Sequence, residues 1–409
     1  IISATLGKPE QIPDGSRVIG LDLTASAEKA TGVALLDGRQ VQTCSIDTDD
    51  ELLAYIHKHQ PRIVSIDSPL GLPGGGSEIK KSAGIVRLAE RDLTSIGIPA
   101  YPALIDSMKP LTLRGIVLKQ KIESLHPAPI VIESYPGAAQ DILALPRKQR
   151  SLELLREGLK GIGLHGPGLD SKSHDEIDAI TAAIVGRFYE NSRYIPMGTP
   201  SESELIVPAI GPLIFETPLI ICLAGKTGAG KSTVARYLSV FYGLKWLKTR
   251  DLIRELLIED ATASPNKRLF TRAVDPQNIT EADLREFGGV ILNKHKQEPL
   301  RRKLTTKIVN AKDSFVIDSV RAYSDIEWLA LGEEHPIIWL IDCDEKTLQS
   351  RLTNRAKQGV KKPTTASPVD TGVAELLPRA DRIIPNTGSL EALRWAVDDV
   401  LFSHIRIGK

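Results

Sequence analysis

The chain has 409 residues, which is too long for one ordinary domain and favours two or three. Hydrophobic residues make up 42% and charged residues 25%, so wholesale disorder is excluded. The 52 basic and 51 acidic residues give a net charge of +1, which excludes a strongly basic nucleic-acid coat or an acidic tail. The balance is slightly uneven, because residues 1–208 carry 22 basic and 26 acidic residues, a net of −4, against +5 for residues 209–409.

Three cysteines, Cys44, Cys222 and Cys343, lie far apart in apolar stretches and lack CxxC spacing. This pattern predicts reduced, buried thiols and disfavours a disulfide framework or a cysteine zinc site. Residues 1–6 are too short for a signal peptide and have no basic flank. Prolines interrupt the apolar stretch at 205–223, which a membrane-spanning helix would tolerate poorly. We therefore expect a cytoplasmic protein without a membrane partner.

Strand and helix patterns alternate along the first half, which predicts an α/β fold. A hairpin turn is predicted at Asp37-Gly38. A long helix is expected to begin at Ser173, because Ser173 and Glu176 form a capping-box pattern. The expected strands are residues 17–23, 32–36, 41–46, 63–66 and 130–132, and the expected helices are residues 49–59 and 173–189.

Closely spaced prolines between residues 194 and 218 indicate a stiff connection, within which residues 204–207 are a candidate edge strand. We predict a first domain at residues 1–208, a proline-rich linker at 209–217 and a second α/β domain at 218–409. The second domain is expected to contain strands at residues 219–224, 314–317 and 337–341 and helices at residues 231–242 and 390–403.

Residues 225–232 read GKTGAGKS and fit the phosphate-binding pattern GxxxxGK[ST] at every fixed position, between a strand and a helix. Glycines let the backbone wrap closely, so that N–H groups point at phosphate oxygens, and the helix N-terminus adds a favourable dipole. In such a loop Lys231 reaches the β- and γ-phosphates and Ser232 holds Mg²⁺; the alternative is a structural glycine-rich turn. The predicted ATP-binding residues are Gly225, Thr227, Gly228, Ala229, Gly230, Lys231, Ser232 and Thr233.

Four further segments of the second half are distinctive: TRDLIR at 249–254, LREFG at 284–288, FVIDSVR at 315–321 and ADRIIPNTG at 380–388. Together with the loop they resemble the nucleoside monophosphate kinase-like family, which includes dephospho-CoA kinase and archaeal AMP-kinase-like relatives. The resemblance covers most of residues 218–400 and implies ATP and Mg²⁺ as cofactors. Two departures are Ser319, which replaces the usual glycine, and residues 357–367, which contain lysines but no further arginine.

This resemblance implies roles for particular residues. Phosphoryl transfer requires neutralised charge and an aligned acceptor, so Lys231, Arg351 and Arg355 are the expected electrostatic set. Asp251 would orient or deprotonate the acceptor hydroxyl. The alternative for Asp251 and Arg254 is a solvated i,i+3 pair on a helix, and the alternative for Arg351 and Arg355 is an exposed helical face. The remaining expected roles are acceptor binding by Arg254, Arg285 and Arg321, Mg²⁺ binding by Ser232 and Asp318, and an adenine-side turn at Asn386 and Gly388.

Acidic residues of the first half end strands or begin a helix. Unpaired buried carboxylates are destabilising, and divalent cations such as Mg²⁺ or Mn²⁺ would relieve that repulsion. Two such ions can assist the in-line attack of water on a phosphodiester. Each residue could instead be a simple turn cap. The candidate metal ligands are Asp22, Asp67, Glu133, Asp175 and Asp178, of which Asp22, Asp67 and Asp178 are also the candidate catalytic residues.

The segments around these acids are VIGLDL at 18–23, SIDSPLGLP at 65–73, VIESYP at 131–136 and DEIDA at 175–179. They resemble the RNase H-like fold, and more narrowly an uncharacterised family of predicted RNase H-like nucleases related to RuvC-type resolvases. The resemblance implies a nuclease that acts on RNA or DNA. Actin-like ATPases share this fold ancestry, so nucleotide binding without cleavage stays open. The basic run at residues 147–150 either contacts phosphate or is a solvated surface.

The leading interpretation is a bifunctional α/β protein. An RNase H-like phosphodiesterase domain would precede a P-loop kinase domain that phosphorylates a nucleotide-like or CoA-like small molecule. The alternative is a single-activity kinase or an ATP-switched interaction protein, in which the first half is a binding or regulatory module.

Overall fold

The computed structural model describes residues 2–6, 11–26, 29–210, 213–215, 218–264, 268–270, 272–294, 298–308, 313–320, 323, 326–327, 336–357 and 373–408. Contacts divide the chain into an N-terminal unit, residues 7–212, and a C-terminal unit, residues 1–6 together with 213–409. The predicted first domain at 1–208 therefore began too early, because residues 1–6 pack with the second unit. In the part of the chain that the structure describes, no helix is both long and apolar enough to cross a membrane.

The N-terminal unit is built on a seven-stranded sheet with the order β4-β3-β2-β5-β6-β8-β7. Strands β2, β5, β6 and β8 run parallel, whereas β3, β4 and β7 are each antiparallel to their neighbours. The strands are β2 (Val18–Asp22), β3 (Thr31–Asp37), β4 (Gln40–Ile46), β5 (Ile63–Asp67), β6 (Ile130–Ser134), β7 (Tyr194–Met197) and β8 (Leu205–Pro208).

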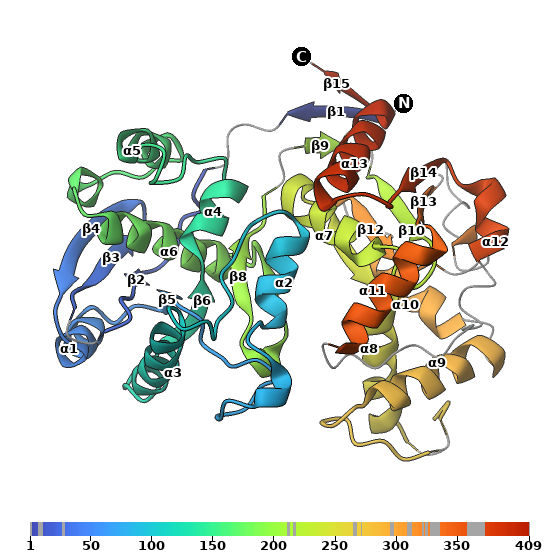
Figure 1. Ribbon diagram of the computed structural model, residues 1–409, viewed down its shortest axis with the longest axis horizontal. Coiled ribbons are helices and arrows are strands. Elements are labelled where there is room, and N and C mark those ends of the chain that lie inside the picture. Colours follow the sequence, from blue (N-terminus) through green and yellow to red (C-terminus); the bar gives the residue numbers. More distant parts are fainter. Residues whose placement is uncertain are drawn as a thin grey trace. The chain divides into compact units, whose positions relative to one another are not determined.

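Helices cover both faces of this sheet (Figure 1). Alternate residues of each strand point to opposite faces, so Val18 packs with α4, α5 and α6 while Ile19 packs with α1 and α3. Both faces are therefore apolar, as expected for a largely parallel sheet. The helices are α1 (Asp49–His59), α2 (Leu88–Ser95), α3 (Lys109–Glu123), α4 (Pro136–Ile142), α5 (Leu152–Gly161) and α6 (His174–Glu190).

Much of the predicted stiff connection forms strands, and the predicted linker at 209–217 contains strand β9 (Leu213–Phe215). Residues 194–208 supply β7 and β8, and β8 lies between β6 and β7, so it is not the edge strand expected at 204–207. Pro196 lies in β7, which is the edge strand, and Pro208 ends β8. Because proline cannot donate a ladder hydrogen bond, these are positions where a sheet tolerates it.

A five-stranded parallel sheet with the order β11-β12-β10-β13-β14 forms the centre of the C-terminal unit. Its core has one apolar cluster with α7 and α13 and another with α8, α9 and α10. The strands are β10 (Ile220–Ala224), β11 (Lys245–Lys248), β12 (Phe315–Asp318), β13 (Ile337–Asp342) and β14 (Arg382–Pro385). The helices are α7 (Lys231–Tyr242), α8 (Thr249–Thr262), α9 (Glu281–Lys294), α10 (Glu298–Ile308), α11 (Glu345–Lys357), α12 (Val373–Leu376) and α13 (Leu390–His404).

A second, smaller sheet of this unit joins segments that are distant in sequence. Strand β1 (Ile2–Leu6) lies between β15 (Ile405–Gly408) and β9 (Leu213–Phe215), parallel to β15 and antiparallel to β9. The two ends of the chain therefore meet in one sheet (Figure 1). The N-terminal unit is consequently inserted between β1 and β9 of the C-terminal unit.

Candidate functional sites

The predicted phosphate-binding loop connects β10 to α7. Gly225, Gly228 and Gly230 have φ angles of 142°, 90° and 106°, which side chains other than hydrogen rarely allow. A Cβ on Gly230 would also lie 2.3 Å from Asn386 Nδ2. The backbone path thus requires glycine, and it leads directly into the N-terminus of a 12-residue helix. This is the geometry of an anion-binding loop.

Lys231 and Ser232, the first two residues of α7, already have partners within the unit. Lys231 Nζ donates to Gly225 O at 2.7 Å and to Lys226 O at 3.0 Å, so the ammonium group lies over the loop. Ser232 Oγ donates to Asp318 Oδ2 at 2.7 Å. Asp318 is 4% exposed and ends β12, the strand next to β10. A hydroxyl and a carboxylate side by side are suitable oxygen ligands for Mg²⁺.

Ser319, the departure noted in the sequence, has a φ of 72°. Glycine adopts this conformation more readily than serine does, which fits the glycine that the resemblance leads one to expect here. The Ser319 hydroxyl donates to Asp318 Oδ1 at 3.0 Å and so orients the second carboxylate oxygen. Ser319 therefore supplies a hydrogen bond to the Mg²⁺-binding candidate that glycine could not supply.

Asn386 links the phosphate-binding loop to Arg351. Its Nδ2 donates to Ala229 O at 2.6 Å, and its Oδ1 accepts from Arg351 Nη2 at 3.1 Å. Arg351 also donates to Cys343 Sγ at 3.4 Å. Asn386, which the sequence placed on the adenine side, is thus buried and joins the loop to Arg351. Gly388 lies in an exposed bend two residues later.

Arg351 is therefore held beside the loop through Asn386. Thr233 N donates to Gly230 O in the first turn of α7, and Thr227 lies in the loop itself. Arg355 belongs to α11, but its side chain lies outside the described residues. Arg321 lies outside them altogether.

The arginines that the sequence predicts to bind the acceptor include Arg254 on α8 and Arg285 on α9. Burial lowers the pKa of Arg250, and the nearby charges of Arg254 and Arg285 lower it further, against the opposing effect of Asp251. We call Arg250, Arg254 and Arg285 the arginine cluster. Asp251 is exposed on the same first turn of α8. Arg254 and Arg285 act unfavourably on the charge of Arg250, and a bound anion would offset that effect.

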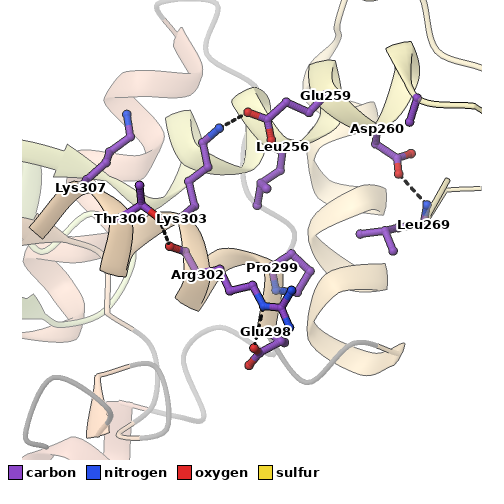
Figure 2. Close-up of a pocket in the computed structure, with 11 residues that line it drawn as sticks. Leu256, Glu259, Asp260, Leu269, Glu298, Pro299, Arg302, Lys303, Thr306 and Lys307 are labelled. Carbon is purple, nitrogen blue, oxygen red and sulfur yellow. Dashed lines mark hydrogen bonds and ion pairs between the residues drawn. The ribbon is translucent and has the colours of Figure 1, made fainter. Parts of the chain in front are cut away.

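A cavity of about 720 Å³ lies farther along α8, between α8 and α10 (Figure 2). Its charged side chains are paired with one another: Lys303 with Glu259, and Arg302 with Glu298. Asp260 accepts from the backbone N–H groups of Leu269 and Phe270. Because these charges are already compensated, the arginine cluster is the better candidate for binding an anionic acceptor.

Comparisons with known proteins agree with this architecture. Residues 221–371 match the family described as AAA domain. A UPF0200 protein of Aeropyrum pernix is 28% identical over 182 residues, which is 43% of this chain and 89% of that protein. The C-terminal unit thus contains a P-loop domain that is similar to these proteins.

Similar solved structures include TT1252 from Thermus thermophilus, at 23% identity and a TM-score of 0.31, covering 46% of this chain and 98% of that one. Dephospho-CoA kinase from Campylobacter jejuni is 18% identical with a TM-score of 0.31, covering 45% and 96%.

The N-terminal unit brings three of the predicted acids together. One carboxylate oxygen each from Asp22, Asp67 and Asp178 lies within 4.8 Å of the other two. Asp22 and Asp67 are direct neighbours across β2 and β5. Helix α6 delivers Asp178 because Gly20 allows its close approach; a Cβ there would lie 2.0 Å from Ala179 O. We call these three residues the carboxylate cluster.

The electrostatics of the carboxylate cluster are unfavourable without a cation. Burial raises the pKa of Asp22 to about 8, and the charge of Asp178 adds to the effect. Burial also raises the pKa of Asp67 well above its usual range, and the charge of Asp22 raises it further. The Oγ of Ser134, beside Asp67 on β6, is buried without a hydrogen-bond partner among the described residues. This all-oxygen set fits Mg²⁺ or Mn²⁺.

Asp178 is held from both sides by residues that follow β6. Gln140 of α4 is 1% exposed, and its Nε2 donates to Asp178 Oδ1 at 3.1 Å. Lys148, in the loop between α4 and α5, forms an ion pair with Asp178 Oδ2. The sequence indicated a basic run at Lys148 but gave no sign that it reaches the acids, and it gave no signal for Gln140.

The prediction of Glu133 as a metal ligand was wrong. In β6 it is Ser134, not Glu133, that lies opposite Asp67, so the Glu133 side chain points to the other face of the sheet. There Arg87 donates to both of its oxygens, at 2.8 and 2.5 Å, and Leu70 N donates at 2.7 Å. Both side chains are 1% exposed. Glu133 therefore fastens the loop after β5 to the sheet.

Asp175 also differs from its predicted role as a ligand. It is exposed in the first turn of α6 and is not part of the carboxylate cluster, although its charge contributes to the raised pKa of Asp22. The capping-box prediction beside it was half correct. Ser173 accepts from Glu176 N, but the Glu176 side chain accepts from Thr43 and Ser45 of β4 instead.

Proposed function

We propose that the C-terminal unit transfers the γ-phosphoryl group of ATP to a small anionic acceptor of nucleotide-like or CoA-like chemistry. The observation that carries this proposal is the phosphate-binding loop, with Ser232 bonded to Asp318, in the same unit as the arginine cluster. Mg²⁺, bound by Ser232 and Asp318, would neutralise charge on the phosphates.

The chain's own groups have distinct tasks in this reaction. Lys231 exchanges its two loop carbonyls for phosphate oxygens when ATP enters. Arg351, oriented by Asn386, stabilises charge on the transferred group. Asp251 orients the acceptor hydroxyl, and the arginine cluster binds the acceptor's anionic groups.

The test is ATP-dependent phosphorylation of a panel of nucleoside monophosphates and dephospho-CoA. Lys231→Ala should abolish transfer, and Arg285→Ala should raise the KM for the acceptor while the Kd for ATP stays unchanged. Arg302→Ala is the matched control, because Arg302 is 78% exposed and pairs only with Glu298 among the described residues. Full turnover by Lys231→Ala would refute the proposal.

We propose a second function for the N-terminal unit, that of a metal-dependent phosphodiesterase with an RNase H-like fold. The carboxylate cluster supports it, as does the sheet, in which β4, β3 and β2 are antiparallel neighbours and β2, β5, β6 and β8 run parallel. Divalent ions held there would activate water for attack on phosphorus. Asp22, Asp67 and Asp178 would hold the ions, and Gln140 would orient Asp178.

Cleavage of RNA, DNA and hybrid duplexes in Mg²⁺ or Mn²⁺ tests this second function. We expect Asp67→Asn to be inactive and Asp175→Asn to keep most of the activity, because Asp175 lies outside the carboxylate cluster. If the wild-type protein cleaves none of these substrates, the N-terminal unit is better described as a binding or regulatory module of a single-activity kinase or an ATP-switched protein.

A further inference from the structure

Lys148 occupies a position that the proposed phosphodiesterase function does not use. The loop that carries it is fixed at both ends. Leu145 N donates to Gln140 O at 2.8 Å, and Arg147 forms an ion pair with Asp141 and donates to Tyr135 Oη at 3.1 Å. Arg150 N then closes a turn on Arg147 O at 2.9 Å. Lys148 is therefore directed to Asp178 by a well-bonded loop.

The ion pair itself is largely shielded from water. The Lys148 side chain is 21% exposed and that of Asp178 is 10% exposed. The ammonium group also interacts with Asp22, Asp67 and Asp175. A single flexible lysine thus supplies the positive charge that three convergent carboxylates require, in the place where a divalent cation would be bound.

We propose that Lys148 is a tethered counter-ion of the carboxylate cluster, which a divalent cation must displace from Asp178 in order to bind. This inference rests on the proposed metal-binding role of the cluster. Displacement needs only rotation of the lysine side chain, since its backbone is held by neighbouring residues. In the metal-free unit, Lys148 thereby reduces repulsion between the carboxylates. The apparent metal affinity falls as the fraction of molecules in which Lys148 is paired with Asp178 rises.

The size of the effect follows from this competition. When a ligand binds only the competent fraction, the apparent Kd is the intrinsic Kd divided by that fraction. If Lys148 is engaged in about nine of ten molecules, its removal tightens metal binding about tenfold. A residue that merely supports the fold, or that contacts only the substrate phosphate, would not tighten metal binding when removed.

The experiment is titration of the full chain with Mn²⁺ in the absence of nucleotide, with free Mn²⁺ measured by electron paramagnetic resonance. The variants are Lys148→Met, which removes the charge, and Lys148→Arg, which keeps it. Asp67→Asn defines the signal from the carboxylate cluster, because other Mn²⁺ sites persist in that variant. Lys160→Met is the matched control, since Lys160 is half exposed and pairs with Glu157 away from the cluster.

We expect Lys148→Met to bind Mn²⁺ about tenfold more tightly than wild type, with Lys148→Arg and Lys160→Met close to wild type. In EDTA, Lys148→Met should melt at a lower temperature than wild type, and saturating Mn²⁺ should restore it. Unchanged or weaker binding by a folded Lys148→Met would overturn the counter-ion role and leave the metal site standing. Absence of Asp67-dependent Mn²⁺ binding in both wild type and Lys148→Met would overturn the metal site and the counter-ion role together.

Discussion

Replacing Asp22 with asparagine should stabilise the metal-free N-terminal unit at pH 8. The substitution keeps the shape of the side chain and removes one charge from the carboxylate cluster. In the wild type the folded-state pKa of Asp22 is about 8, above the usual 3.8, so the folded protein holds a proton that the unfolded chain releases. The contribution of Asp22 to stability is therefore fully present near pH 4 and is lost as the pH rises towards 8.

The magnitude follows from the pKa difference. About four units at about 1.4 kcal/mol each set an upper limit of about 6 kcal/mol. The actual effect is smaller, because the titration of Asp22 is linked to that of Asp67, Lys148 offsets negative charge, and water can enter the partly exposed site. We therefore expect Asp22→Asn to increase the free energy of unfolding by about 2 kcal/mol at pH 8 and to change it little at pH 4. Mn²⁺ should stabilise the wild type at pH 8 and have a much smaller effect on the variant.

All four tryptophans follow residue 240, so intrinsic fluorescence would report mainly on the C-terminal unit. Hydrogen exchange of peptides from β2 and α6, measured from pH 5 to 8 with a correction for the intrinsic exchange rate, reports on the cluster itself. The reasoning is refuted if the wild type and Asp22→Asn show the same pH dependence in EDTA, or if the variant is less protected at pH 8.

Three further substitutions test other parts of the structure. Arg87→Met should destabilise the N-terminal unit by about 3–5 kcal/mol in chemical denaturation, because it leaves buried carboxylates unpaired, and adding Glu133→Gln should recover part of the loss. Gly20→Ala should cost more than about 2 kcal/mol and reduce Mn²⁺ binding, since the new Cβ would collide with the backbone of α6; normal stability and binding would contradict the packing. Asn386→Ala should raise the Kd for ATP and slow phosphoryl transfer, measured by ATP titration and single-turnover kinetics. An unchanged Kd and rate would show that the hydrogen bonds of Asn386 to Ala229 and Arg351 are not needed.

The parts of the sites that the sequence predicted depend on short-range patterns. The phosphate-binding loop is encoded by fixed spacing, and Lys231 and Ser232 follow from it. Asp22 and Asp67 could be placed together because the carboxyl ends of neighbouring parallel strands meet at one edge of a sheet. Asp178 could be aimed at the same edge because the alanine-rich face of its helix allows close packing.

The missed features depend on register and on long-range contacts. Strand β6 continues through Ser134, one residue beyond Glu133, the acid that was predicted to end it. Because successive side chains of a strand point to opposite faces of the sheet, a register difference of one residue places Glu133 on the face opposite to Asp67. Lys148 reaches the carboxylate cluster through the path of a loop, which no periodic pattern describes. The pairing of β1 with β15 joins residues about four hundred positions apart, which local propensity cannot predict.

That pairing makes the chain a nested arrangement, since the N-terminal unit begins and ends within the other unit's fold. A single proteolytic cut between β8 and β9 would therefore not separate the two units, because β1 would still be hydrogen-bonded to β15 and β9. Genetic separation has a corresponding consequence. A C-terminal fragment that starts at residue 213 would expose two unpaired strand edges, whereas one that carries residues 1–6 on a short connector would keep them covered.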